Sequence, residues 1–227
     1  MSKLLYLFLL PLVFSLVRYQ FALFQMKRDI ESKSTDLNDA PVDRLNGRMA
    51  AVLGVSSIDA NIFEIDAVNG FAVPDGRIFI TRGLMNRYRV GDISAEEIAS
   101  VIAHEIGHVA LGHAKRRMVD VAGKDAMRIA LGFMFLKIPL VGNLIADFLA
   151  RIFVSGLSRR DEYAADKFAS GLLIKSGIGT APQKSLFDKL GMMGSGADGV
   201  AWLMDHPKAK DRILAIEKNE REWGVHA

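Results

Sequence analysis

Five consecutive residues carry the clearest chemical signal in the chain. They are His104-Glu105-Ile106-Gly107-His108, which fit the pattern H-E-x-x-H. On a helix, two histidines four positions apart lie about 40° apart around the axis, so both imidazoles can reach one metal ion. Glu105 lies about 100° from His104, beside the metal position, where a general base for an attacking water stands. The pattern predicts a zinc site with His104 and His108 as ligands and Glu105 as the base.

A helix must hold these residues, and the surrounding sequence predicts one. Ser94 is placed as an N-cap before two glutamates, and apolar side chains follow at helical spacing through Ile106. This spacing sets the helix in a core, so we expect the histidine pair to line a buried face or a cleft. His113 follows His108 by five positions, about 140° round the helix, so we expect it to point away from the metal as a surface or packing residue.

The third ligand must come from elsewhere in the chain, because a catalytic zinc ion usually has three protein ligands. Residues 158–166 open a second predicted helix, which runs toward Gly177. On it, Glu162 and Asp166 share one face, where two carboxylates repel each other unless a cation lies close. We expect Glu162 to ligate the metal and Asp166 to accept the ring N–H of a ligating histidine. The two alanines between them let this helix approach the first one closely. A solvated charged face is the alternative interpretation.

In this order, residues 104–108 and the E-x-x-A-D pattern of residues 162–166 resemble a known family. It comprises the membrane-linked zinc metallopeptidases of the HtpX, Oma and CAAX prenyl endopeptidase kind. Residues 69–84 resemble the strand pair that precedes its catalytic helix. His206-Pro207, followed by Arg212-Ile213, resembles its C-terminal His-Pro…Arg element. The resemblance covers roughly residues 40–220.

The resemblance implies a gluzincin-type endopeptidase with one Zn²⁺ per chain. Its ligands would be His104, His108 and Glu162, with Glu105 as the base. Its partners would be polypeptide substrates, membrane or membrane-proximal proteins. By this resemblance, His206 should also face the zinc. Pro207 favours an extended or turn conformation at His206, before a helix predicted from about Lys208. His206 could stabilise the oxyanion of the tetrahedral intermediate or occupy the open zinc position in a resting state, and a helix-capping role is the third possibility.

Short β-rich runs flank two turn signals in the middle of the chain. The runs are residues 62–65 and 77–81, and the turns are Asn69-Gly70 and Pro74-Asp75-Gly76. They predict a hairpin or a small antiparallel sheet. An exposed edge strand there could pair with an extended peptide through backbone hydrogen bonds. The substrate-binding residues that we expect are Asn69, Phe71, Ala72 and Val73.

Composition sets the broad class. The chain has 227 residues, 50% of them hydrophobic, and no cysteine, so no disulfide framework exists. A net charge of +3, without basic runs between aromatics, argues against nucleic acid as a partner. We predict a mainly helical α+β protein with a zincin-type catalytic domain, a small antiparallel sheet and an N-terminal hydrophobic helix. The predicted segments are an anchor or signal-like helix (1–26), a polar linker (27–41) and a metallopeptidase domain (42–223) with a hydrophobic helical insertion at about 125–157.

The N-terminus is apolar from Leu4 to Val17, except for Ser15, and again over residues 21–24. Together these runs can span a membrane if Arg18 reaches the interface, and no small-x-small cleavage site follows. We expect a single-pass anchor with membrane lipid as a partner. A cleaved signal, leaving a secreted or periplasmic protein, and a buried helix are the alternatives. Flanking charges lean toward a cytoplasmic catalytic domain. The insertion is either a packed hairpin or a membrane-contacting one.

Two other functions fit parts of the same sequence. One is a proteolytically silent, zinc-binding chaperone or adaptor for extended polypeptides, which the intact Glu105 disfavours. The other is a membrane scaffold with a structural metal, which a closed site of four protein ligands would favour.

Overall fold

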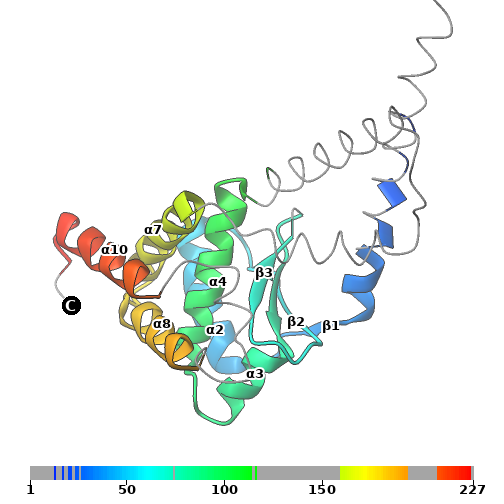
Figure 1. Ribbon diagram of the computed structural model, residues 1–227, viewed down its shortest axis with the longest axis horizontal. Helices are drawn as coiled ribbons and strands as arrows, with labels where there is room; N and C mark the ends of the chain where they lie inside the picture. Colours follow the sequence, from blue (N-terminus) through cyan, green and yellow to red (C-terminus); the bar gives the residue numbers. More distant parts are fainter. Residues whose placement is uncertain are drawn as a thin grey trace, which may run out of the picture. The chain divides into compact units, whose positions relative to one another are not determined.

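The computed structural model describes residues 27–73, 75–113, 159–193 and 209–225, with Arg116 and a few single positions between 13 and 25. The chain forms two compact units, Met1–Lys33 with Lys115–Ser155 and Ser34–Ala114 with Gly156–Ala227. In the first unit, residues 27–32 are helical. The second unit contains the elements shown in Figure 1, which are strands β1 (Ser34–Asp36), β2 (Ala60–Phe63), β3 (Gly70–Ala72) and β4 (Ile78–Thr81) and helices α2 (Ala40–Leu53), α3 (Arg82–Arg89), α4 (Ala95–Ala110), α7 (Arg159–Lys175), α8 (Ala181–Met193) and α10 (Ala209–Glu222).

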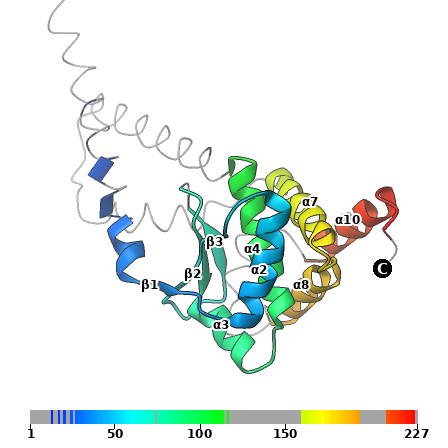
Figure 2. The same cartoon turned by 180° about the vertical axis from the view of Figure 1, so that it is seen from behind.

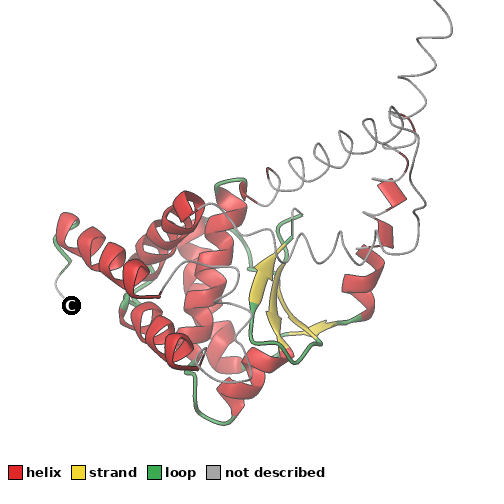
Figure 3. Cartoon of the chain, viewed as in Figure 1, coloured by secondary structure: helices red, strands yellow, loops and turns green. Residues whose placement is uncertain are grey.

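A mixed four-stranded sheet, in the order β1-β2-β4-β3, forms one layer of this unit (Figure 3). β2 pairs with β4 in parallel, whereas β1–β2 and β3–β4 are antiparallel. The prediction of an antiparallel sheet is therefore wrong for the central pair. The β-rich runs in β2 and β4 do not form a hairpin, because residues 70–72 form a separate edge strand. The turn before β4, in which Gly76 has a φ of +100°, joins β3 to β4 instead.

Strand β1 lies in the segment 27–41, for which the composition predicts a polar linker. The sequence Ser-Thr-Asp shows no hydrophobic alternation, so periodicity could not identify it as a strand. It joins the sheet through its backbone, with Thr35 opposite Ile62 of β2. Within the predicted linker, these three residues form a strand of the second unit.

Helix α4 lies at the centre of the unit. The sheet packs on one side of it and α7 and α8 on another, and the reverse view in Figure 2 shows α2 across it. Its start follows the prediction, because Ser94 and Glu97 form a reciprocal capping box. All residues from Glu97 to His108 are buried. Glu97 is tolerated there because it also accepts hydrogen bonds from Ser185 (2.6 Å) and Lys189 (2.8 Å) of α8.

The hydrophobic core lies between the sheet and the helices. It includes Ile62, Ile78 and Ile80 of the sheet, Met49 of α2, Ile98 and Ile102 of α4, Leu173 of α7, Phe187 of α8 and Ile216 of α10. Two glycines allow other elements to pack closely against α4. A Cβ at Gly70 of β3 would lie 2.6 Å from Cγ1 of Val101, and a Cβ at Gly107 would lie 2.9 Å from the carbonyl oxygen of Ala165. The predicted close approach of α7 to α4 is thus confirmed at Ala165.

The predicted hydrophobic segments fall largely outside this description. The insertion at 125–157 is not among the described residues, and of residues 1–26 only single positions are. Within the described parts of the chain, no helix combines the length and the hydropathy needed to cross a membrane.

Candidate metal centre

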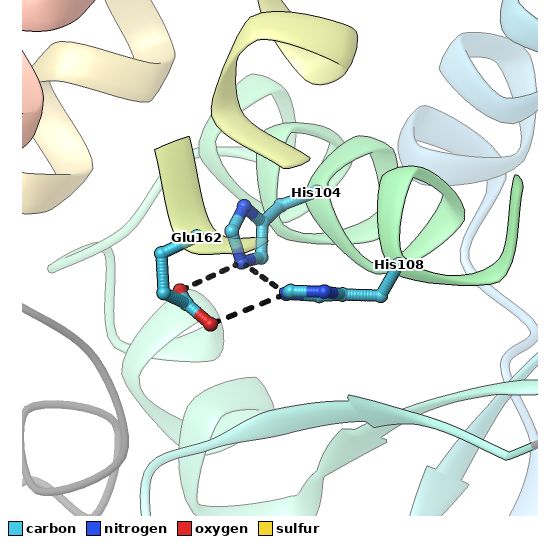
Figure 4. Close-up of side chains that lie close together, drawn as sticks. All are labelled: His104, His108 and Glu162. Atoms are coloured by element: carbon cyan, nitrogen blue, oxygen red, sulfur yellow. Dashed lines mark hydrogen bonds and ion pairs between the residues drawn. The ribbon is translucent and has the colours of Figure 1, made fainter. Parts of the chain in front are cut away.

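Helices α4 and α7 bring three predicted ligands together. His104 and His108 of α4 and Glu162 of α7 converge on one point (Figure 4). The Nε2 atoms of the two histidines are 3.0 Å apart, and each lies 3.5 Å from one oxygen of the Glu162 carboxylate. All three side chains are buried.

This donor set fits a zinc ion. Bonds of about 2.0–2.2 Å in a tetrahedral site place the donor atoms roughly 3.3–3.6 Å apart. The observed separations of 3.0 and 3.5 Å need adjustments of only a few tenths of an ångström. Two imidazoles and a carboxylate are also a ligand set that catalytic zinc uses. Among the described residues the group has three members, while His206 lies outside them.

The other ring nitrogen of His104 faces Asp166, as the sequence predicts. Nδ1 of His104 is 3.0 Å from Oδ1 of Asp166, so its N–H can donate there while Nε2 faces the metal position. Burial and Arg212 lower the pKa of His104, but its hydrogen bonds with Asp166 and Glu162 outweigh them and raise that pKa to about 9. A cation at this position must therefore displace a proton from His104, and its binding weakens as the pH falls.

Arg212 of α10 is a component of the site to which sequence reasoning assigned no role. Its side chain is 1% exposed, and it donates hydrogen bonds to both carboxylate oxygens of Asp166, at 2.7 and 2.6 Å. Burial raises the pKa of Asp166, but the Arg212 guanidinium and His104 lower it to about 2. The guanidinium also lies 4.0 Å from the ring centre of Phe187. The sequence did contain a sign that Arg212 is buried. It precedes the buried Ile216 by one helical turn, on a face that should be apolar.

Glu105 is buried on α4, with 4% of its surface exposed, next to His104 in the sequence. A carboxylate is therefore available inside the protein at the position that the H-E-x-x-H pattern assigns to a base.

His113 departs from the prediction. It does not point away but is 5% exposed, with its Nδ1 3.0 Å from Nδ1 of His108. Its Nε2 lies 3.4 Å from Oδ1 of Asp161. The predicted angle assumed an uninterrupted helix, whereas α4 ends at Ala110 and Gly112 adopts a φ of +69°. This left-handed residue turns the chain, and His113 comes back to His108.

The predicted substrate strand is the edge strand β3. Asn69 is buried, and its Oδ1 accepts a hydrogen bond from the backbone N–H of Gly70 (2.9 Å), so it supports the strand locally. Phe71 is partly exposed and stacks on Phe79, with ring centres 5.2 Å apart. Ala72 is partly exposed, and Val73 is buried. His206 and Pro207 lie outside the described residues, and α10 begins at Ala209, close to its predicted start.

The chain is similar to known proteins over most of this length. The sequence profile of Peptidase family M48 matches residues 36–220. Metalloprotease LoiP of Escherichia coli (strain K12) is 31% identical over 172 residues, which are 74% of this chain and 65% of that protein. Mitochondrial metalloendopeptidase OMA1 of Arabidopsis thaliana is 32% identical over 145 residues, 64% of this chain and 28% of that protein. Protease HtpX of Pseudomonas putida (strain GB-1) is 27% identical over 205 residues, 73% of this chain and 66% of that protein.

The chain thus spans 28–66% of the length of these three relatives. The family match covers both helices of the metal centre, from which the resemblance to zinc metallopeptidases was drawn. With residues 36–220 matched, the chain belongs to peptidase family M48.

Proposed function

We propose that this protein is a zinc-dependent endopeptidase that hydrolyses peptide bonds of membrane or membrane-proximal proteins. The observation that carries the proposal is the convergence of His104, His108 and Glu162 from two helices, with Glu105 buried beside them. The relatives support the reaction type, because those compared above are named as a metalloprotease, a metalloendopeptidase and a protease.

Each residue of the centre then has a separate task. A zinc ion held by His104, His108 and Glu162 would polarise the scissile carbonyl and activate water. Glu105 accepts the proton of the attacking water and delivers it to the leaving amine. Asp166, itself held by Arg212, keeps the His104 ring in the orientation and tautomer that leave Nε2 free to ligate.

The substrate would bind along strand β3. This strand lies at the end of the sheet and packs against α4, the helix that carries the histidines. An extended polypeptide can pair with the backbone of an edge strand, which recognises shape more than sequence. We assign this role to Asn69, Phe71, Ala72 and Val73. In this assignment Asn69 and Val73, which are buried, support the strand, while Phe71 and Ala72 contact the substrate.

Two further assignments concern residues outside the described parts. We propose that residues 1–26 anchor the domain to a membrane, with the catalytic domain on the cytoplasmic side. We also propose that His206 faces the zinc. Substitution of His206 by alanine changes peptidase activity in opposite directions for its two possible roles. Loss of an oxyanion donor lowers kcat, whereas removal of a side chain that blocks the open zinc position raises activity.

Replacement of Glu105 by glutamine tests the function. The amide cannot accept a proton, while all three ligands remain, so Glu105→Gln should bind zinc with unchanged affinity and lose peptide cleavage. Glu96→Gln is the matched control, because Glu96 lies on the exposed side of the same helix, and it should keep both properties. Glu162→Ala should lose zinc and cleavage together.

Peptide cleavage by zinc-loaded Glu105→Gln at the wild-type rate would contradict the assignment of the base. A zinc-loaded wild-type protein that binds extended peptides without cleaving any would point to the silent chaperone or adaptor instead. Zinc content, peptide hydrolysis and the effect of a chelator distinguish these outcomes.

A further inference from the structure

We propose that His113 is a positioning residue of the metal centre, which accepts a hydrogen bond from His108 and, together with Asp161, orients that ligand. The inference rests on the proposed function only in assuming that zinc binds to His104, His108 and Glu162.

The two ring nitrogens of His108 have different neighbours. Nε2 faces the metal position, 3.0 Å from Nε2 of His104 and 3.5 Å from Glu162. Nδ1 lies 3.0 Å from Nδ1 of His113. A ligating nitrogen carries no proton, so the proton of a neutral His108 is on Nδ1 and is donated to His113.

The same reasoning determines the state of His113. Since its Nδ1 accepts from His108, a neutral His113 carries its proton on Nε2. That nitrogen lies 3.4 Å from Oδ1 of Asp161, a carboxylate on α7. His108 thus donates to His113, whose Nε2–H faces the Asp161 carboxylate, and each histidine has one tautomer.

The two metal-ligating histidines are supported in parallel ways. Nδ1 of His104 meets Asp166 directly, at 3.0 Å, whereas His108 reaches Asp161 through His113. Both carboxylates come from α7, on either side of the ligand Glu162 in the sequence. The Asp166 side chain is 0% exposed and that of Asp161 is 22% exposed. Helix α7 therefore supplies Glu162, the direct partner of His104 and the carboxylate that contacts His113.

The turn after α4 brings His113 to this place. Gly112 has a φ of +69°, which glycine adopts readily and most other residues do not. Among the described residues, no atom lies within 4 Å of the position that a Cβ would take at Gly112. Its backbone conformation, rather than lack of space, thus requires glycine there. This gives a second means of displacing His113 without changing its side chain.

The first experiment compares two substitutions of His113 in the full chain. His113→Asn places an amide oxygen near the position of Nδ1 and can still accept from His108, whereas His113→Leu cannot. Loss of such an outer partner typically weakens metal binding about 10–100-fold. His113→Leu should weaken zinc binding to this extent, and His113→Asn should recover most of it. Zinc affinity is measured by competition with a chromophoric chelator, and the absorption spectrum of bound Co²⁺ reports the ligand geometry.

The melting temperature without metal separates positioning from plain packing. His113→Leu should keep the metal-free melting temperature close to that of the wild type and reduce the rise that zinc causes. Tyr88→Phe is the control, because it removes a hydrogen bond between Tyr88 of α3 and Asp39 at the start of α2 (3.0 Å), neither of which belongs to the metal centre. It should lower the metal-free melting temperature without changing zinc affinity.

The second experiment displaces the turn. Gly112→Asn, which tolerates a left-handed conformation, should bind zinc nearly as well as the wild type, and Gly112→Val should resemble His113→Leu. Gly91 has a φ of +85° and equally open surroundings in the loop after α3, so Gly91→Val controls for backbone strain.

The proposal is overturned if His113→Leu binds zinc as tightly as the wild type. It is also overturned if His113→Leu and His113→Asn weaken zinc binding equally and lower the metal-free melting temperature equally, because the role would then be packing. Peptide cleavage tests the proposed function separately, and a wild-type protein that binds zinc without cleaving peptides would leave the His113 result standing.

Discussion

Replacing Gly107 by alanine should weaken metal binding, although it adds only one methyl group. The new Cβ would lie 2.9 Å from the carbonyl oxygen and 3.1 Å from the Cα of Ala165. Both atoms belong to the backbone of α7, so no side-chain rotation can relieve the contact. Helices α4 and α7 must therefore move apart at this point.

The size of the movement follows from ordinary contact distances. Carbon atoms in contact are about 3.5–4.0 Å apart, so the Cβ–Cα distance has to grow by about 0.4 Å or more. Helix α4 carries two of the proposed ligands and α7 the third, and ligand distances in a metal site hold within about 0.2 Å. We expect zinc affinity to fall at least about tenfold, or about 1.4 kcal/mol. Overpacking costs about 1–3 kcal/mol of folding stability, of which alanine recovers about 0.5–1 kcal/mol through its better helix propensity.

Gly47 of α2 supplies a matched control. A Cβ at Gly47 would have no atom of the described residues within 4 Å. Gly47→Ala should therefore stabilise the protein by about 0.5–1 kcal/mol and leave zinc affinity unchanged. Denaturant unfolding in the presence of a chelator measures stability, and competition with a chromophoric chelator measures zinc affinity. Ala165→Gly should not rescue Gly107→Ala, because the crowded atoms are backbone atoms. The reasoning is refuted if Gly107→Ala behaves like Gly47→Ala in both measurements.

Three further predictions concern other parts of the protein. Arg212→Met leaves the buried Asp166 without its guanidinium partner, so the free energy of unfolding should fall by about 3–5 kcal/mol. Adding Asp166→Asn to the Arg212→Met variant should recover part of this loss. Equal stability of the wild type and Arg212→Met in denaturant unfolding would contradict the prediction. Hydrogen bonds from Arg82 lower the pKa of Glu64 from 4.5 to about 2. A lowered pKa in the folded state contributes stability above the ordinary value, which is lost as the pH falls from 4.5 to about 2. The pair is partly exposed, so we expect a contribution of up to about 1 kcal/mol, which Glu64→Gln should remove from unfolding curves measured across this pH range. A chain that starts at Ser34 should fold, bind zinc and lose membrane association in a flotation assay. Persistent membrane binding would assign the membrane contact to residues 125–157. Failure to fold would show that the N-terminal helix is part of the core.

The regular geometry of the helix explains why the residues of the candidate metal centre could be placed together from the sequence. The period of a helix is the same in any protein, so the spacing of His104 and His108 on α4 places both on one face. The same spacing on α7 puts Asp166 on the same face as Glu162, and the carboxylate of Asp166 lies 3.0 Å from Nδ1 of His104. The start of α4 could also be predicted from nearby residues, because Ser94 and Glu97 form its capping box within one turn.

Long-range pairing explains the errors in the sheet. Which strand pairs with which depends on backbone contacts between distant residues, and the side-chain pattern of a single short strand does not encode it. The sequence pattern predicts an antiparallel pairing of the runs that form β2 and β4. In the structure, β3 is the strand that pairs antiparallel with β4, and β2 and β4 are parallel. β1 has no apolar pattern and becomes visible only through its pairing with β2.

By itself, the sequence determined the helices, the faces that they present and the chemistry that those faces could carry. The tertiary structure decided how the faces meet. The contact of Gly107 with Ala165 sets the separation of helices α4 and α7. Arg212 binds Asp166, which lies 46 positions earlier in the chain. The turn at Gly112 replaces an expected outward direction of His113 with a contact to His108. A local pattern predicts the direction of a side chain only while its helix continues, and contacts between distant residues depend on how the whole unit packs.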